Sequence, residues 1–186
     1  MTLFLGLLAG VALLVLLWAI ALYNTLVRRR ALVEEGWSGI ETQLKRRANL
    51  VPNLIETVKG YAAHERGTLE DLTAARTASL RAHTVEEQAE AQRTLGRALG
   101  SLMAVAEAYP DLKASQTFGQ LQTELAEIED QIQLSRRYYN GTVRDLNIMV
   151  DQFPSNIVAG RFGFRKATFF EIEDAAERSV PRVDFS

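Results

Sequence analysis

The residues of this 186-residue chain that could do chemistry are polar side chains on or beside the predicted core faces of its helices. Buried polar groups need hydrogen-bond partners, so such a set has two interpretations. It forms either an internal network that fixes helix register or a site that binds a ligand or a partner, and the network is the favoured interpretation. The set consists of Gln43, Arg47, Asn53, Glu56, His64, Arg76, Glu124, Glu129, Arg136, Asn140 and Asn147.

The sequence lacks the common catalytic and metal-binding patterns. Di-iron sites in helical bundles need a Glu three residues before a His. Tyr61 stands at that position before His64, and a leucine stands there before His83. The chain also lacks an H-x-x-x-H pair, a G-x-x-x-x-G-K-[ST] loop and a G-x-S-x-G elbow, and it contains no cysteine. We therefore expect no catalytic, metal-binding or cofactor-binding residues, and a protein that is not an enzyme.

The element that would position the polar set spans residues 37–65. Apolar residues recur there every three or four positions, which predicts a core-facing helix. Arg47 occupies a position on this apolar stripe, and a buried charge is costly unless it is paired. We expect it to pair with a carboxylate of a facing helix, either Glu124 or Glu129. Pro52, one turn later, predicts a kink or a helix boundary.

An uncharged apolar run precedes this element. Residues 3–23 would span about 31 Å as a helix, which matches a hydrocarbon core of roughly 30 Å. A cleaved signal peptide is disfavoured, because no Lys or Arg precedes the run and the run is long for that purpose. We expect a retained transmembrane anchor and membrane exit over residues 1–27. Gly6 and Gly10 form a G-x-x-x-G pair, which predicts self-association in lipid, unless they only reflect the frequency of glycine in membrane helices.

Charge asymmetry predicts the orientation of the anchor. Arg28, Arg29 and Arg30 follow the run, whereas only the α-amine precedes it. The positive-inside rule then predicts a single-pass protein with its amino terminus outside and its remaining chain in the cytoplasm. The opposite topology is the alternative, because the prediction depends on one cluster. The net charge of −2 gives no basic footprint for nucleic acid.

Capping residues indicate where the next helices begin. Thr68 is the predicted N-cap of a second helix, which ends near His83. Thr84 and Glu87 form a capping box for a third helix. That helix is expected to end at Tyr109, because a residue before proline is disfavoured in helical geometry.

The last and longest helix is predicted to start after Ser115 as its N-cap. It holds one heptad register from Phe118 to Phe153, which is a coiled-coil pattern. The predicted fold is all-α: an N-terminal transmembrane helix, then an antiparallel up-down-up-down four-helix bundle over residues 28–154. An irregular C-terminal segment is expected over residues 155–186.

The C-terminal segment carries aromatic side chains beside cations. An up-down-up-down bundle ends its last helix near the bilayer that its first helix leaves, so we expect this segment to be membrane-proximal. Alternatively, the rings cover the open end of the bundle or contact a neighbouring subunit. The residues concerned are Arg161, Phe162, Phe164, Arg165 and Lys166.

The chain contains a series of ordered motifs: QLKRR at residues 43–47, NLVPNL at 49–54, KGYAAHE at 59–65, YPDLK at 109–113 and FP at 153–154. This series resembles the LemA family of bacterial membrane-anchored proteins. The resemblance covers nearly the whole chain after the anchor and implies a four-helix bundle without established catalysis. The family includes a magnetosome protein, which implies a role in membrane organisation. Gly36 departs from the expected alanine, and the chain lacks the lipoprotein cysteine of some relatives.

Taken together, these features predict a non-enzymatic, membrane-anchored scaffold or adaptor. We expect it to form a homo-oligomer in the lipid bilayer, to bind another membrane protein, or both, and not to bind nucleic acid. The alternative is a small-ligand receptor or an enzyme that uses the polar cluster around Arg47. An enclosed pocket of several hundred Å³ lined by that cluster would favour the alternative, whereas solid packing around paired charges would favour the scaffold.

Overall fold

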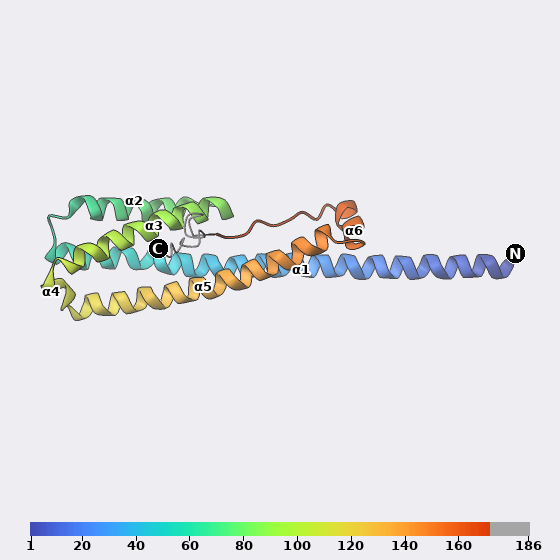
Figure 1. Ribbon diagram of the computed structural model, residues 1–186, viewed down its shortest axis with the longest axis horizontal. Helices are drawn as coiled ribbons and strands as arrows, with labels where there is room; N and C mark the ends of the chain where they lie inside the picture. Colours follow the sequence, from blue (N-terminus) through green and yellow to red (C-terminus); the bar gives the residue numbers. More distant parts are fainter. Residues whose placement is uncertain (172–186) are drawn as a thin grey trace, which may run out of the picture. The chain divides into compact units, whose positions relative to one another are not determined.

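The computed structural model describes residues 1–171, and within them every regular element is a helix (Figure 1). The all-α prediction, with a membrane-type helix at the N-terminus, is confirmed. The helices are α1 (Thr2–Tyr61), α2 (Arg66–Arg81), α3 (Val85–Glu107), α4 (Pro110–Lys113), α5 (Gln116–Asp151) and α6 (Ser155–Phe162).

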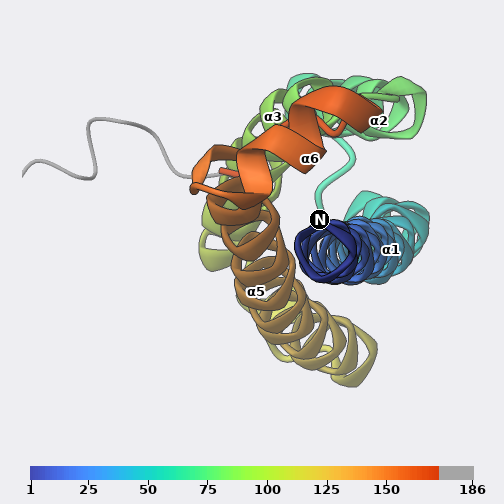
Figure 2. The same ribbon diagram turned by 90° about the vertical axis from the view of Figure 1, so that its right-hand side faces the viewer.

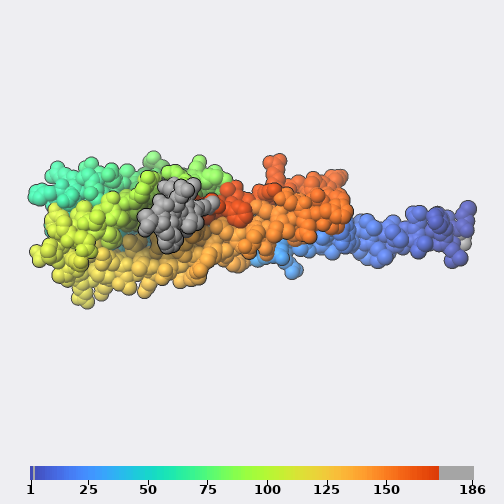
Figure 3. Space-filling view, in the orientation of Figure 1, coloured from blue at the N-terminus to red at the C-terminus, as the bar shows by residue number. Residues whose placement is uncertain are grey.

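Helix α1 carries the apolar run and continues past the three arginines at residues 28–30 without a break. It contains an 18-residue window with a mean hydropathy of 2.8, none of which is buried. Figure 3 shows the first part of α1, in dark blue, uncovered on the face in view. The helix is therefore long and apolar enough to cross a membrane, and no linker separates its apolar part from its second half.

Pro52 does not end α1, so a helix boundary at that position is the wrong alternative. The proline removes one backbone donor, but its ring is exposed and lies on the outer face of the helix. Val51 and Leu54 on either side of it are fully buried. Their packing holds the helix together across the missing hydrogen bond, since tertiary packing rather than propensity stabilises most helices in proteins.

The capping predictions are confirmed for two helices and wrong for one. Thr84 Oγ1 accepts from the Glu87 backbone N–H at 3.1 Å and completes the capping box of α3. Ser115 Oγ accepts from the backbone N–H of the third residue of α5 at 3.4 Å. Thr68, however, does not cap α2, which starts earlier, at Arg66, without a side-chain cap. The chain already turns at residues 63–64, so Thr68 falls inside the first turn.

The end of the long helix also differs from the prediction. Most of the heptad positions on α5 are buried, but α5 ends at Asp151 and Phe153 is 74% exposed. The segment from 155 onwards is not wholly irregular, because α6 occupies residues 155–162. Ser155 and Val158 are buried on one side of α6, and Gly163 ends it in the left-handed region at φ 73°. An eight-residue helix is too short to show periodicity in sequence.

The described chain divides into two compact units. Unit 1 consists of Met1–Glu41 and Leu134–Phe169, and unit 2 consists of Thr42–Gln133 with the segment that starts at Phe170. In unit 2, the long helices α1, α2, α3 and α5 run in alternating directions (Figure 1), as expected for an up-down-up-down arrangement. Its fully buried apolar side chains include Val51, Leu54, Val58, Leu72, Leu95, Leu102, Leu112, Phe118 and Ile132.

In unit 1, α1 and α5 approach closely at Gly36. A Cβ added there would lie 3.2 Å from the Cα of Tyr139 on α5. The glycine that departs from the expected alanine is thus explained by backbone proximity. The Trp37 ring lies beside the same tyrosine, with 5.4 Å between the ring centroids.

Candidate functional site

The buried polar cluster of unit 2 is centred on Arg47 of α1. Its Nη2 lies 3.0 Å from Glu129 Oε2 on α5, and its Nη1 donates to Gln92 Oε1 on α3 at 3.3 Å. Gln92 Nε2 in turn donates to Ser79 Oγ on α2 at 2.7 Å. One side chain from each of the four long helices therefore joins a single network, which we call the Arg47 cluster.

Burial is unequal within the ion pair of this cluster. The Arg47 side chain is 8% exposed, whereas that of Glu129 is 38% exposed. Burial lowers the pKa of Arg47 from its ordinary value, and the negative charge of Glu129 opposes this effect. The guanidinium still remains charged at neutral pH, because arginine is in practice always protonated in proteins. Within residues 1–171 its Nε has no hydrogen-bond partner.

The Arg47 cluster contains part of the predicted polar set and two residues outside it. Of the two carboxylates suggested for Arg47, Glu129 makes the pair and Glu124 is exposed. Gln92 and Ser79 are not among the residues predicted from the sequence. A signal for Gln92 exists, because it precedes the core residue Leu95 by three positions and so lies on the buried stripe of α3.

The other predicted polar residues of unit 2 lie outside the Arg47 cluster. Gln43 accepts a hydrogen bond from Arg46 on the helix surface. Arg76 donates from Nε to the Ala48 carbonyl at 2.8 Å and so ties α2 to the backbone of α1. The remaining side chains of this group are exposed: Asn53, Glu56 and His64.

In unit 1, Asn147 fastens the segment after α6 to α5. Its Nδ2 donates to the Ala167 carbonyl at 3.0 Å, and its Oδ1 accepts from the Ala167 backbone N–H at 2.8 Å. The Tyr139 hydroxyl donates to the Thr168 carbonyl at 2.8 Å and supports the same attachment. Arg136 and Asn140 are half-buried on α5 of this unit.

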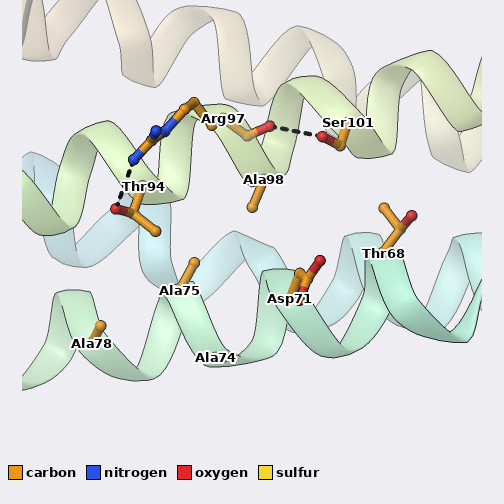
Figure 4. A pocket seen from close by; sticks show the side chains of 9 residues that line it. All are labelled: Thr68, Asp71, Ala74, Ala75, Ala78, Thr94, Arg97, Ala98 and Ser101. Atoms are coloured by element: carbon orange, nitrogen blue, oxygen red, sulfur yellow. Dashed lines mark hydrogen bonds between the residues drawn. The ribbon is translucent and has the colours of Figure 1, made fainter. Parts of the chain in front are cut away.

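Two grooves on unit 2 flank α2, and the residues of the Arg47 cluster line neither of them. The groove between α2 and α3 measures about 540 Å³ and is lined by four alanines and five polar or charged residues (Figure 4). Arg97 turns toward Thr94 in this groove, and its Nη2 lies 3.4 Å from the Thr94 hydroxyl. A second groove of about 680 Å³ lies between the end of α1 and α2. Across residues 1–171, no three His, Asp or Glu side chains gather as metal ligands.

An aromatic cluster lies in unit 1 where the apolar part of α1 ends. The Tyr23 ring makes edge contacts with Phe162 and Phe164, at centroid distances of 4.9 and 5.8 Å. The Arg30 guanidinium lies over the Phe164 ring at 5.6 Å. The segment after α5 therefore returns to the end of the apolar run.

The cations near this aromatic cluster are partly paired. Arg29 binds Asp145 on α5 at 2.8 Å, and Lys166 binds Asp151. Arg161, on α6, and Arg165 are exposed, and neither has an ion-pair partner within residues 1–171.

Comparison with known proteins gives one family and several relatives. The model of the LemA family matches residues 36–185, which is more than half of the chain. Magnetosome protein MamQ 1 of Paramagnetospirillum magneticum is 28% identical, over 85% of this chain and 68% of that protein. Magnetosome protein MamQ of Magnetospirillum gryphiswaldense is 24% identical over the same shares. Protein LemA of Metamycoplasma hominis is 28% identical, over 87% of this chain and 72% of that protein. The resemblance carried by the ordered motifs is thereby confirmed, and the chain belongs to the LemA family.

Proposed function

We propose that this protein is a non-enzymatic, membrane-anchored scaffold or adaptor that self-associates, binds another membrane protein, or does both. The observation that carries the proposal is the Arg47 cluster. Its hydrogen bonds and ion pair link α1, α2, α3 and α5 to one another, and its residues line neither groove. Polar groups used in this way stabilise one arrangement of helices, as a scaffold requires. The relatives named as magnetosome proteins support a role in membrane organisation.

The anchor supplies the proposed surface for self-association. A Cβ added at Gly6 or Gly10 would meet no atom of the described chain within 4 Å. The backbone at these two positions is therefore open to a second helix, and small residues four apart allow close helix packing in lipid.

The second candidate function is a small-ligand receptor or an enzyme that uses the cluster around Arg47. One observation favours it: the Arg47 Nε is buried without a partner in the described chain, and Glu129 is partly open to water. An unpaired buried donor is costly, and a ligand could satisfy it. We favour the scaffold because both terminal nitrogens of this side chain already contact protein groups, Glu129 and Gln92.

Crosslinking in native membranes tests the proposal. A tagged full-length chain is crosslinked in its own membrane and purified in detergent. We expect an adduct between two copies, or a stoichiometric adduct with one membrane protein. Recovery of neither adduct, together with specific binding of a small molecule that Arg47→Met abolishes, would favour the second candidate.

The proposed orientation places unit 1 beyond residue 23 in the cytoplasm, because the arginines at 28–30 follow the apolar run. The absence of cysteine makes this testable with one substitution. A cysteine at the exposed position Glu35 should react with a membrane-impermeant maleimide only after the cells are permeabilised. Labelling of intact cells at the same rate would reverse the topology.

A further inference from the structure

Helix α6 lies crosswise to the helix that carries the apolar run. In Figure 2, where α1 is seen end-on, α6 is seen from the side. The contacts of Tyr23 with Phe162 and Phe164 fix this helix at the level where the apolar run ends. If α1 crosses a bilayer along its normal, α6 then lies flat at the boundary between hydrocarbon and headgroups.

Large apolar side chains remain exposed on and beside α6. Phe153 is 74%, Ile157 is 63% and Phe162 is 59% exposed. Single exposed apolar residues are ordinary on a protein surface. Three such residues lie within ten positions, beside the end of a run whose side chains are also uncovered, and exposed apolar surface gathered in this way indicates a partner. Helices that lie in the membrane interface carry large apolar side chains such as Phe and Leu on the face that enters the lipid.

The charges around α6 indicate the chemistry of that partner. Arg161 lies on α6 and Arg165 lies just after it. Arg28 lies on α1, after the end of the apolar run. Arg161 and Arg165 are exposed, and within residues 1–171 none of the three has an ion-pair partner. Apolar side chains combined with unpaired cations at one level match the boundary of a bilayer that contains anionic lipid.

We propose that α6 is a second membrane contact, which lies in the headgroup region and inserts Ile157 and its apolar neighbours into lipid. The occupant of this surface is the bilayer that holds α1, because Tyr23 joins the two apolar surfaces. The inference rests on the membrane anchor of the proposed function. It adds that the chain contacts the membrane at two places, through α1 and through α6. The second contact fixes the rotation of α1 about its own axis.

Site-directed spin labelling of the full-length chain tests this proposal. Single cysteines at Ile157, Glu35 and Ile20 each receive a nitroxide, and each protein is placed in phosphatidylcholine vesicles that contain phosphatidylglycerol. Accessibility to oxygen, which concentrates in lipid, is compared with accessibility to a water-soluble nickel chelate. Glu35 is the matched control, because it is exposed on α1 about 18 Å beyond Tyr23, at 1.5 Å per residue.

We expect the label at residue 157 to be more accessible to oxygen than to nickel, like the label at residue 20 and unlike the label at residue 35. High nickel accessibility at residue 157 would overturn the proposal. Low accessibility to both reagents would also overturn it, because a second copy or another protein would then cover α6. Nickel accessibility at residue 20 as well would show that the anchor itself, and with it the proposed function, is wrong.

Discussion

Breaking the Arg47–Glu129 pair from its two sides should have unequal costs. Glu129→Gln removes the negative charge and leaves the guanidinium buried without compensation. Arg47→Met removes the positive charge and leaves a carboxylate that is already 38% exposed and can hydrate. The structure therefore predicts that Glu129→Gln is the more destabilising change.

The magnitudes follow from burial. Removing one partner of a fully buried pair costs about 3–5 kcal/mol. Water reaches the Glu129 side of this pair and the glutamine oxygen can still accept a hydrogen bond, so we expect about 2–3 kcal/mol for Glu129→Gln. The large cost of breaking a buried pair comes from the charge left buried, and after Arg47→Met the remaining Glu129 carboxylate is 38% exposed and can hydrate. The remaining cost of Arg47→Met is the loss of the hydrogen bond to Gln92, which should lower the free energy of unfolding by about 1 kcal/mol.

Urea denaturation of the full-length chain in detergent, followed by circular dichroism, measures these free energies. The double variant Arg47→Met/Glu129→Gln should be no less stable than Arg47→Met alone, because the double variant contains neither charge of the pair and so leaves no buried charge unpaired. A larger loss for Arg47→Met than for Glu129→Gln would refute the reasoning from burial. Additive losses in the double variant would show that the two charges do not interact.

Three further predictions concern single contacts. Thr84→Ala removes the N-cap of α3 and should lower the free energy of unfolding by about 1 kcal/mol; an unchanged urea midpoint would show that the cap is dispensable. The hydrogen bond to Glu65 raises the pKa of Tyr109, so the stability it contributes is complete below the unfolded pKa of about 10 and is lost as the pH rises through the folded pKa. The Tyr109 phenolate absorbance, identified by its loss in Tyr109→Phe, should therefore appear at a lower pH in Glu65→Gln than in the wild type. Equal titration midpoints in these two proteins would contradict the assignment. Gly163→Ala places a side chain at φ 73° and should lower the free energy of unfolding by about 1–2 kcal/mol, measured by thermal unfolding. An unchanged stability would argue against this backbone conformation.

The helices and their core faces were predictable because the buried face of a helix carries apolar residues every three or four positions. The stripe positions Leu121, Ile128 and Ile132 are all buried in α5, as their spacing indicates. The need of Arg47 for a partner was predictable from its place on such a stripe. The choice between Glu124 and Glu129 was not, because it depends on how far α5 is shifted along α1, and no local pattern records that shift.

The features that could not be predicted depend on contacts distant in sequence. Gln92 became a network member only because α3 brings it within reach of Arg47. Helix α6 is too short for a periodic signal, and the segment after it is held by Asn147, twenty positions before the backbone group that it binds. The predicted start of α2 was wrong because threonine is a common N-cap residue, and Thr68 was therefore assigned that role. The turn before Thr68 instead determines that the helix begins at Arg66.

Self-association through the anchor is tested most directly by energy transfer between donor- and acceptor-labelled full-length chains in lipid vesicles. The comparison is between the wild type, Gly6→Leu/Gly10→Leu, and the control Ala12→Leu. Ala12 lies on the opposite side of α1 from Gly10, because two residues turn a helix by about 200°. The added leucines at the glycines should leave the fold unchanged, since a Cβ there meets nothing within 4 Å. We predict transfer above random mixing in the wild type and the control, and its loss in the glycine variant. Transfer no higher than random mixing in the wild type, or equal transfer in the glycine variant, would contradict a scaffold assembled through this anchor.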